Sequence, residues 1–300
     1  MKTIVVLGDL NIDLIFSGVE TMPVLGREIL ANNYRLKIGG SAANTACMLA
    51  LAGCPVRFYG SVGDDFFGRW LIAELKKYGL DSKTVRLAGG QRTGVTVALT
   101  YPEDRMYITD SGTVAAASLE DMAEGYLVEG GHLHLAAYFL QKKLKPDIGG
   151  LIRRAKTSGM TVSLDPGHDP DGKWDLSGLK SYWRYLDFFL PNADELKSLA
   201  GIDGLERALA SFPPASVKGV VVKHGAHGAL LRNNGQVEKY PAPGKVKVID
   251  TSCAGDCFNA GFLAALNRGD SVENAVRLGN RYGTAAVGAV GLPEKLPEKF

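Results

Sequence analysis

The 300-residue sequence lacks any apolar run approaching the roughly 20 residues that a membrane-spanning helix needs, so we expect no membrane partner. It also lacks a strong charge imbalance. The 34 Lys and Arg residues nearly balance the 32 Asp and Glu residues, and the net charge of +2 does not indicate a nucleic-acid surface. Four cysteines are too few for a disulfide framework in a chain this long, which favours the reducing cytoplasm.

Two common nucleotide-binding motifs are absent. The first turn, Gly8-Asp9-Leu10-Asn11-Ile12-Asp13, has no Gly-x-Gly-x-x-Gly pattern, which argues against a dinucleotide-dependent oxidoreductase. The glycine-containing turn from Lys223 to Gly228 follows an apolar run but does not end in Gly-Lys-Ser/Thr, so it is not a P-loop. Such a turn after a buried strand still suits the phosphates or ribose of a nucleotide.

What the sequence does contain is a regular alternation of apolar, β-branched runs with segments of helical period. This succession predicts one α/β domain over residues 1–300, with a mostly parallel, doubly wound sheet and helices on both faces. We found no internal repeat and no linker. The expected strands and helices are Ile4–Leu7, Ala42–Ala52, Val56–Gly60, Phe66–Tyr78, His132–Ala136, Ile148–Ser158, Thr161–Leu164, Asp187–Leu190, Asp194–Ala200, Gly219–Val222, Val246–Ile249 and Ala254–Leu266.

Two segments, about residues 13–38 and 92–110, break this rhythm because they lack helical periodicity. They contain strand-like pieces, and Tyr101-Pro102-Glu103-Asp104 joins two of these like a hairpin turn. We predict that both insertions form a small β-sheet that projects from the main sheet. Such a sheet can act as a lid over a site, or expose an apolar face for a homodimer.

The most informative motif is Asp250-Thr251-Ser252-Cys253-Ala254-Gly255-Asp256-Cys257-Phe258, at the start of the last-named helix. Small residues at a helix start leave backbone N–H groups free and unshielded, and together with the helix dipole these groups bind anions. The carboxylate of Asp256 opposes phosphate binding unless it has a chemical task, such as accepting a proton from an attacking hydroxyl. The motif therefore indicates phosphoryl transfer to an alcohol.

Two further groups of polar residues suit a hydroxyl-bearing ligand. Gly39 and Gly40 precede a helix and allow close approach of a small ligand, with Asn44 one turn into that helix. Asn11 and Asp13 follow the first strand, where open parallel sheets place their ligand sites. Each group has an equally acceptable structural interpretation, as a tight turn or as a helix cap.

Elsewhere, structural interpretations compete more strongly with functional ones. Asn192 and Glu195 have the spacing of a capping box, or lie near Mg²⁺-bound phosphates. Asn280 precedes small residues that either pack closely or border a flat purine. The pairs His224/His227 and His132/His134 lack a third ligand nearby in the sequence, so a metal site has little support.

These motifs, in this order, resemble the PfkB (ribokinase-like) family of carbohydrate and nucleoside kinases over nearly the whole chain. Gly39, Gly40 and Asn44 match the early signature of the family. The late signature, Asp-Thr-x-Gly-Ala-Gly-Asp-x-Phe, is matched by residues 250–258 with one departure. The elements Gly63-Asp64-Asp65-x-x-Gly68 and Asn192-x-x-Glu195 also fit.

The resemblance implies a ribokinase-like fold with a β-sheet lid, and ATP with Mg²⁺ as phosphoryl donor. It assigns Asp256 as the base, and the amides of Cys253, Ala254, Gly255 and Asp256 as an anion hole. Relatives often bind a monovalent cation such as K⁺, for which Asp250 would be the side-chain ligand. The remaining roles are acceptor binding by Asn11, Asp13, Gly39, Gly40 and Asn44, and ATP binding by Asn192, Glu195, Lys223, Gly225, Gly228 and Asn280.

Three departures from the family pattern bear on activity and substrate. Cys253 replaces a Gly, and with Cys257 near the same helix start, a lowered thiol pKa would make activity sensitive to oxidation. Inert small side chains are the competing interpretation. Ser41 replaces a Lys, which weakens a phosphofructokinase interpretation. Gln141-Lys142-Lys143 replaces a sugar-binding Glu, so the lysines either favour an acidic sugar or face solvent.

The leading hypothesis is therefore an ATP-dependent kinase that acts on a primary hydroxyl of a sugar. A nucleoside kinase on the same fold is the alternative, and Phe16, Tyr34 and Tyr107 are candidates to contact its base. A catalytically silent sugar- or nucleotide-binding protein is a third hypothesis, which Asp256 disfavours.

Overall fold

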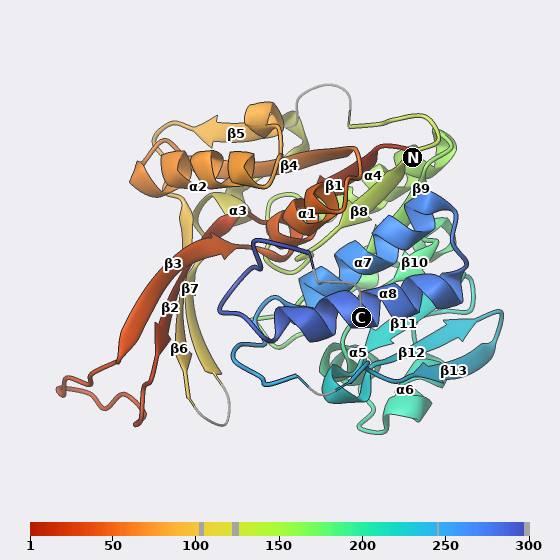
Figure 1. Ribbon diagram of the computed structural model, residues 1–300. Coiled ribbons are helices and arrows are strands. Elements are labelled where there is room, and N and C mark those ends of the chain that lie inside the picture. The colour runs from red at the N-terminus through yellow and green to blue at the C-terminus, as the bar shows by residue number, and fades with distance from the viewer. Residues whose placement is uncertain (102–104, 122–125, 245, 297–300) are drawn as a thin grey trace.

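The computed structural model describes residues 1–101, 105–121, 126–244 and 246–296. Its main feature is a nine-stranded sheet in the order β13-β12-β11-β10-β9-β8-β1-β4-β5 (Figure 1). The seven strands from β11 to β5 run parallel, and β12 and β13 add an antiparallel edge. The strands are β1 (Ile4–Leu7), β4 (Val56–Gly63), β5 (Val85–Ala88), β8 (His132–Leu135), β9 (Thr161–Leu164), β10 (Phe188–Phe189), β11 (Gly219–Lys223), β12 (Ala229–Asn233) and β13 (Gln236–Tyr240).

Helices cover both faces of this sheet, because its central strands are apolar on both sides. In β1, Ile4 and Val6 belong to one core, whereas Val5 and Leu7 belong to the other. The helices are α1 (Ser41–Leu51), α2 (Phe66–Lys77), α3 (Gly112–Ala116), α4 (Lys145–Thr157), α5 (Ala193–Ala200), α6 (Leu205–Ser211), α7 (Ala254–Arg268) and α8 (Val272–Ala286), with short 3₁₀ turns at Ser82–Thr84, Leu119–Asp121, Ser177–Leu179, Trp183–Tyr185 and Gly225–His227. The predicted doubly wound α/β architecture is confirmed.

A second, four-stranded sheet projects from the main body, in the order β3-β2-β6-β7 (Figure 1). Its strands are β2 (Asn11–Ser17), β3 (Asn33–Gly39), β6 (Gly94–Thr100) and β7 (Arg105–Asp110). The outer pairs are antiparallel, and β2 runs parallel to β6. Both predicted insertions therefore contribute to one small sheet, while most of the Tyr101–Asp104 turn lies outside the described residues.

One predicted strand is wrong. The run Val246–Ile249 forms no strand, and Val248 and Ile249 are 62% and 49% exposed. The Ile249 amide instead donates to the Val287 carbonyl, at 2.7 Å, where α8 ends. An apolar run becomes a strand only where a neighbouring strand offers partners, and here the backbone meets the end of a helix.

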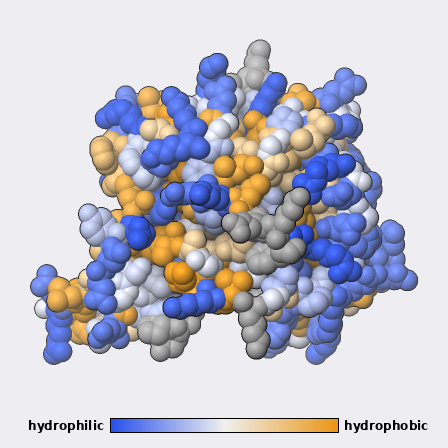
Figure 2. Space-filling view, in the orientation of Figure 1, coloured by the Kyte–Doolittle hydropathy of each residue, from blue (hydrophilic) through white to orange (hydrophobic). Residues whose placement is uncertain are grey.

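Within the described ranges, no helix combines the length and the apolar character needed to cross a bilayer. Figure 2 shows polar residues spread over the visible face, with apolar ones among them. The exposed apolar side chains include Met22, Leu25, Tyr34 and Ile108, on or next to the strands of the small sheet.

Candidate active site

A cleft of about 1880 Å³ lies between the carboxyl ends of the main parallel strands and one face of the small sheet. Asp9 follows β1, Asp165 follows β9 and Lys223 ends β11, and all three side chains line the cleft. Thr96 and Thr109 of the small sheet line it from the opposite side. The carboxyl edge of an open parallel sheet is the usual place for a ligand, because the strand-to-helix turns gather there.

The start of α7 supplies backbone donors to this cleft. No described carbonyl accepts from the amides of Cys253, Gly255 or Asp256, whereas the amide of Ala254 donates to the Thr251 carbonyl at 3.3 Å. A Cβ on Gly255 would have no neighbour closer than 3.6 Å, so the space in front of this turn is open. Of the four predicted donors, Ala254 is therefore the least available to an anion.

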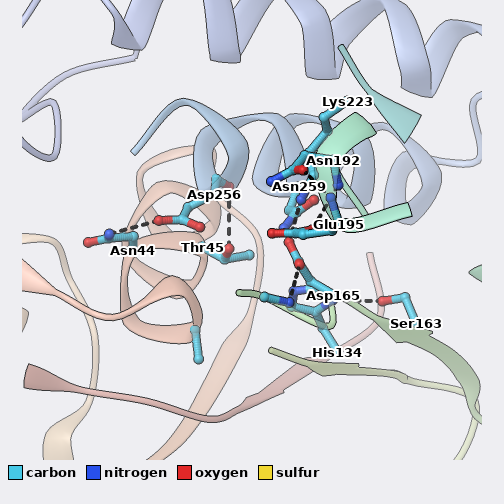
Figure 3. Close-up of polar contacts among 12 residues, drawn as sticks. Asn44, Thr45, His134, Ser163, Asp165, Asn192, Glu195, Lys223, Asp256 and Asn259 are labelled. Atoms are coloured by element: carbon cyan, nitrogen blue, oxygen red, sulfur yellow. Dashed lines mark hydrogen bonds and ion pairs between the residues drawn. The ribbon is translucent and has the colours of Figure 1, made fainter. Parts of the chain in front are cut away.

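Asp256 lies in this first turn and points toward α1 (Figure 3). Its carboxylate accepts a hydrogen bond from Asn44 Nδ2 at 2.9 Å. Burial raises the pKa of Asp256 to about 8, and the negative charges of Asp165 and Asp9 add to that effect. A carboxylate with a pKa near neutrality is suited to accept a proton from an alcohol.

Asp9 holds the start of α1 in place. Its two carboxylate oxygens accept from the amides of Ser41, at 3.0 Å, and Ala42, at 2.9 Å. Gly40 just before them has φ of +101°, a conformation that favours glycine. This anchoring places Asn44, one turn later, against Asp256, and the Oδ1 atom of Asn44 is buried without a partner among the described residues.

Asn11, Asp13 and Gly39 meet on the small sheet. Asn11 Nδ2 donates to Asp13 Oδ1 and to Thr96 Oγ1, both at 3.1 Å. Burial raises the pKa of Asp13 to about 7. A Cβ on Gly39 would overlap the Asp13 carboxylate, so glycine is required there. These predicted acceptor residues lie together and line the cleft, apart from Gly39, which packs behind Asp13.

A second polar cluster forms the floor of the cleft, to the right of Asp256 in Figure 3. Lys223 Nζ and Asn259 Nδ2 both donate to Asp165 Oδ2, at 2.5 Å each. Burial alone would lower the pKa of Lys223, but the charges of Asp165 and Glu195 outweigh it and leave that pKa raised. Burial raises the pKa of Glu195 to about 7, and the negative charge of Asp165 adds to it.

Residues 1–299 match the family model described as pfkB family carbohydrate kinase. The chain belongs to this family. It is 31% identical over 279 residues to an ATP-dependent ribose-1-phosphate kinase from Halopiger xanaduensis, covering 91% of this chain and 88% of that protein. It is 26% identical to ribokinase from Haemophilus influenzae, covering 99% and 96%. The crystal structure of Arabidopsis thaliana ribokinase with ribose and ATP superposes with a TM-score of 0.82, at 25% identity and 98% and 96% coverage.

Several residues that we assigned to ATP also have structural roles in this fold. Gly225 begins a 3₁₀ turn at the edge of the cleft and Gly228 follows it; both line the cleft, and a Cβ on Gly228 would overlap the Tyr240 carbonyl. Asn280 Nδ2 donates to the carbonyls of Tyr240 and Pro241, at 2.9 and 3.3 Å. Asn280 thus also ties α8 to the segment after β13, at the edge of the cleft.

Asn192 and Glu195 form the complete capping box at the start of α5, with both reciprocal bonds at 2.8 Å. Both also line the cleft beside Lys223, so the structural role does not remove them from the site. Asp250 accepts from the Ser252 amide and hydroxyl and from the Gly291 amide. In the described part of the chain, its carboxylate therefore joins two loops.

The idea of reactive thiols at Cys253 and Cys257 is wrong. Both side chains are buried, at 3% and 0% exposure, and burial together with the nearby Asp256 carboxylate raises both thiol pKa values well above their usual range. The helix start does not compensate because low-dielectric surroundings penalise the thiolate more. The interpretation of inert packing side chains is the one that the structure supports.

The structure also shows where the other two departures from the family pattern lie. Gln141 is buried and donates to the Ala136 carbonyl, while Lys142 and Lys143 are exposed and do not line the cleft. Those lysines therefore give no support to an acidic sugar. Ser41 lines the cleft.

Of the three aromatic candidates for a nucleoside base, only Tyr107 lines the cleft, and its hydroxyl approaches Ser252 Oγ at 3.4 Å. Phe16 and Tyr34 contact each other, with ring centroids 6.1 Å apart.

The predicted histidine pairs have other partners. His132 and His134 bond to Ser163, and His132 also bonds to Thr161. The rings of His224 and His227 lie against each other, with their centroids 4.7 Å apart. Over the described ranges, no group of three or more His, Cys, Asp or Glu side chains is arranged to hold a metal ion.

Sequence reasoning missed Asp9, Asp165 and Asn259 as site residues. Asp9 and Asp165 each come directly after a predicted strand or within two residues of it, which was the available signal. Asn259 is one helical turn beyond Asp256, and nothing in its spacing separates it from a packing residue.

Proposed function

We propose that this member of the carbohydrate kinase family transfers a phosphoryl group from ATP to a primary hydroxyl of a sugar. The observation that carries the proposal is the start of α7, where Asp256 stands beside free backbone amides and opposite Asn44. A base next to an anion-binding turn is what phosphoryl transfer to an alcohol requires. A protein that only binds a sugar gains nothing from a carboxylate there.

In this mechanism, Asn11, Asp13 and Asn44 orient the acceptor. The Asp13 carboxylate accepts hydrogen bonds from the acceptor's hydroxyls. Asp256 takes the proton from the attacking hydroxyl, and Asn44 Nδ2 orients the Asp256 carboxylate. The amides of Cys253, Gly255 and Asp256 donate to oxygens of the transferred group. Preorganised donors at the position where negative charge develops lower the barrier without further rearrangement.

The nucleotide would extend from α7 toward Gly225, Gly228 and Asn280, where glycines leave room for close approach. Bound Mg²⁺ supplies charge neutralisation of the ATP phosphates. Glu195 would hold it through waters, because its capping bond leaves Oε1 able to accept from a metal-bound water. Asn192 Oδ1 is used in the cap, so its remaining Nδ2 donor would bond to a phosphate oxygen rather than to the metal's waters. A monovalent cation such as K⁺ near Asp250 stays a prediction.

The small sheet, which we assign to insertions of about residues 13–38 and 92–110, acts as the lid of this domain in our proposal. It supports the role by carrying Asn11 and Asp13 and by facing the cleft with Thr96 and Thr109. Closure would exclude water from the transferred group. A homodimer through the apolar side chains of the same sheet, and a cytoplasmic location, stay predictions.

A nucleoside kinase is the second candidate. The observation that favours it is aromatic: Tyr101 and Tyr107 line the cleft on the side of the small sheet and can contact a base. The similarity to a ribose-1-phosphate kinase adds phosphorylated sugars to the acceptors worth testing.

The test is an ADP-release assay with Mg²⁺ and ATP over neutral sugars, acidic sugars, sugar phosphates and nucleosides, with and without K⁺. We expect ADP release that depends on a sugar acceptor. Release that depends on nucleosides alone would favour the second candidate. Silence over the whole panel, with calorimetry showing ATP bound, would contradict the kinase proposal for these acceptor classes.

A further inference from the structure

An ion pair lies directly behind the anion-binding turn. Lys223 at the end of β11 reaches Asp165, which follows β9, across the intervening strand β10. Asn259 on α7 donates to the same Asp165 oxygen. Three elements that converge on the cleft are therefore joined by one carboxylate, and the Lys223 and Asp165 side chains are only 11% and 4% exposed.

The ammonium of Lys223 is close to the turn itself. A Cβ on Gly255 would lie 3.6 Å from Lys223 Nζ, which makes the lysine the nearest side chain to that glycine. Burial raises the pKa of the Asp256 carboxyl, and the charge of the same ammonium offsets a small part of that rise, so the two groups interact electrostatically. The positive charge thus stands beside the free amides of Gly255 and Asp256.

Lys223 also has unused hydrogen-bonding capacity. An ammonium has three N–H donors, and in the described part of the chain Nζ makes one hydrogen bond, to Asp165. A nearly buried ammonium with donors left over is costly unless a ligand completes its shell. Because Lys223 lines the cleft beside an anion-binding turn, phosphate oxygens are the acceptors that match it.

We propose that Lys223 is a catalytic residue that adds a fixed positive charge to the anion hole and contacts the phosphoryl group in transfer. Asp165 and Asn259 are positioning residues that aim the ammonium at Gly255. This inference rests on the proposed kinase function and assigns a role that backbone amides alone do not fill. The charge opposes the negative charge that gathers on the equatorial oxygens during transfer.

The competing explanation is structural: Lys223 serves only to neutralise Asp165 beneath the sheet. The two explanations differ once the pair is removed as a unit. Lys223→Met alone leaves Asp165 buried and unpaired, and its loss of stability would obscure the result. Lys223→Met/Asp165→Asn removes both charges, keeps the shapes, and retains an amide beside Asn259.

We would therefore measure kcat, the KM for ATP, the KM for the acceptor and the thermal unfolding temperature of the double variant and of a control variant. Lys218→Met is the matched control, because Lys218 also pairs with a buried aspartate, Asp187, at 3.1 Å, but is 72% exposed and does not line the cleft. We expect the double variant to unfold near the wild-type temperature and to lose about 10²-fold in kcat, with the acceptor KM nearly unchanged. The control should keep the wild-type kcat.

Two outcomes would overturn the inference. A double variant with kcat within about threefold of wild type would make the pair structural only. Equal binding of inorganic tripolyphosphate by the wild type and the double variant, measured by calorimetry, would exclude contact with phosphate. This second readout needs no acceptor, so it tests Lys223 even if the assay panel refutes the kinase proposal. We expect about tenfold weaker binding in the double variant and none of this loss in the control.

Discussion

The floor of the cleft and the small sheet above it differ in how their polar side chains are held. On the floor, Asp256 and Asp165 are buried and the Lys223 side chain is only 11% exposed, and each bonds to a residue from a distant element. On the small sheet, Asn11, Asp13 and Thr96 bond mainly to one another, across strands of the same sheet. The other face of that sheet exposes side chains such as Ile108, at 62%.

This difference separates two tasks. The floor is fixed by the core on both faces of the main sheet, so it can keep a base, amides and charges in one geometry. The small sheet keeps its internal bonds if it moves as a unit, so it can change its distance from the floor without losing them. We infer that chemistry belongs to the floor and acceptor choice to the small sheet. The predictions below test that division.

The largest effect should come from the floor. Asp256→Asn removes the base while keeping an oxygen that can accept from Asn44. We expect kcat to fall by about 10²- to 10⁴-fold, with ATP and acceptor affinities retained, because general bases contribute factors of that size. Steady-state kinetics and calorimetry on the same preparations would check it. Turnover near that of the wild type would remove Asp256 from the mechanism.

The pH dependence of activity should reflect the same carboxylate. The pKa of Asp256 is raised to about 8, so the ionised base is lost as pH falls through that value. We expect kcat/KM to fall by about tenfold per pH unit below this pKa, and thus by about 10²-fold at two units below it. A pH profile from 5.5 to 9.5 would measure this. A flat profile across 7 to 9 would contradict the raised pKa.

Stability should change in the opposite sense. A carboxyl whose pKa is higher in the folded than in the unfolded protein binds its proton more tightly when folded, so ionisation destabilises the fold as pH rises from about 4 to 8. Asp256→Asn removes this penalty. Because about four pKa units correspond to at most about 5 kcal/mol, we expect its free energy of unfolding at pH 8 to exceed that of the wild type by about 2–5 kcal/mol, measured by urea denaturation. The gain should vanish near pH 4, and a constant difference would point to another cause.

A substitution on the small sheet should have a smaller effect, and it should change the acceptor KM rather than kcat. Asp13→Ala removes a half-buried carboxyl that accepts hydrogen bonds from the acceptor's hydroxyls. The acceptor KM should rise by about 10- to 100-fold, since hydrogen bonds to a charged group contribute about 1.5–3 kcal/mol. The KM for ATP should change little. Equal weakening of both substrates would place Asp13 outside the acceptor site and break the division of tasks.

The smallest effect should come from the contact between the two regions. Tyr107 on β7 approaches Ser252 with a hydroxyl distance of 3.4 Å, which is a weak hydrogen bond. Tyr107→Phe should change kcat and the acceptor KM by about threefold or less, corresponding to less than about 1 kcal/mol. A loss above about tenfold would mean that this bond holds the small sheet in its working position.

The fold was largely predictable because its signals are local. The buried run Ile4–Leu7 and the helical period of Phe66–Tyr78 needed only their own spacing. Val246–Ile249 failed because a strand also needs a partner, and its neighbour turned out to be the end of α8. Cys253 and Cys257 failed for a related reason: their position at a helix start suggested reactive thiols, while their pKa depends on burial, which spacing does not report.

The sequence by itself determined the alternation of strands and helices, the helix that begins at Ala254 after a run of small residues, and the family to which the chain belongs. Only the tertiary structure decided that Asn44 supports Asp256, that Asp9 anchors α1, and that Asp165 joins Lys223 to Asn259. The physical reason is sequence separation. Helix starts and buried strands follow from neighbouring residues, whereas a polar contact between residues 94 positions apart exists only after the sheet and its helices have packed.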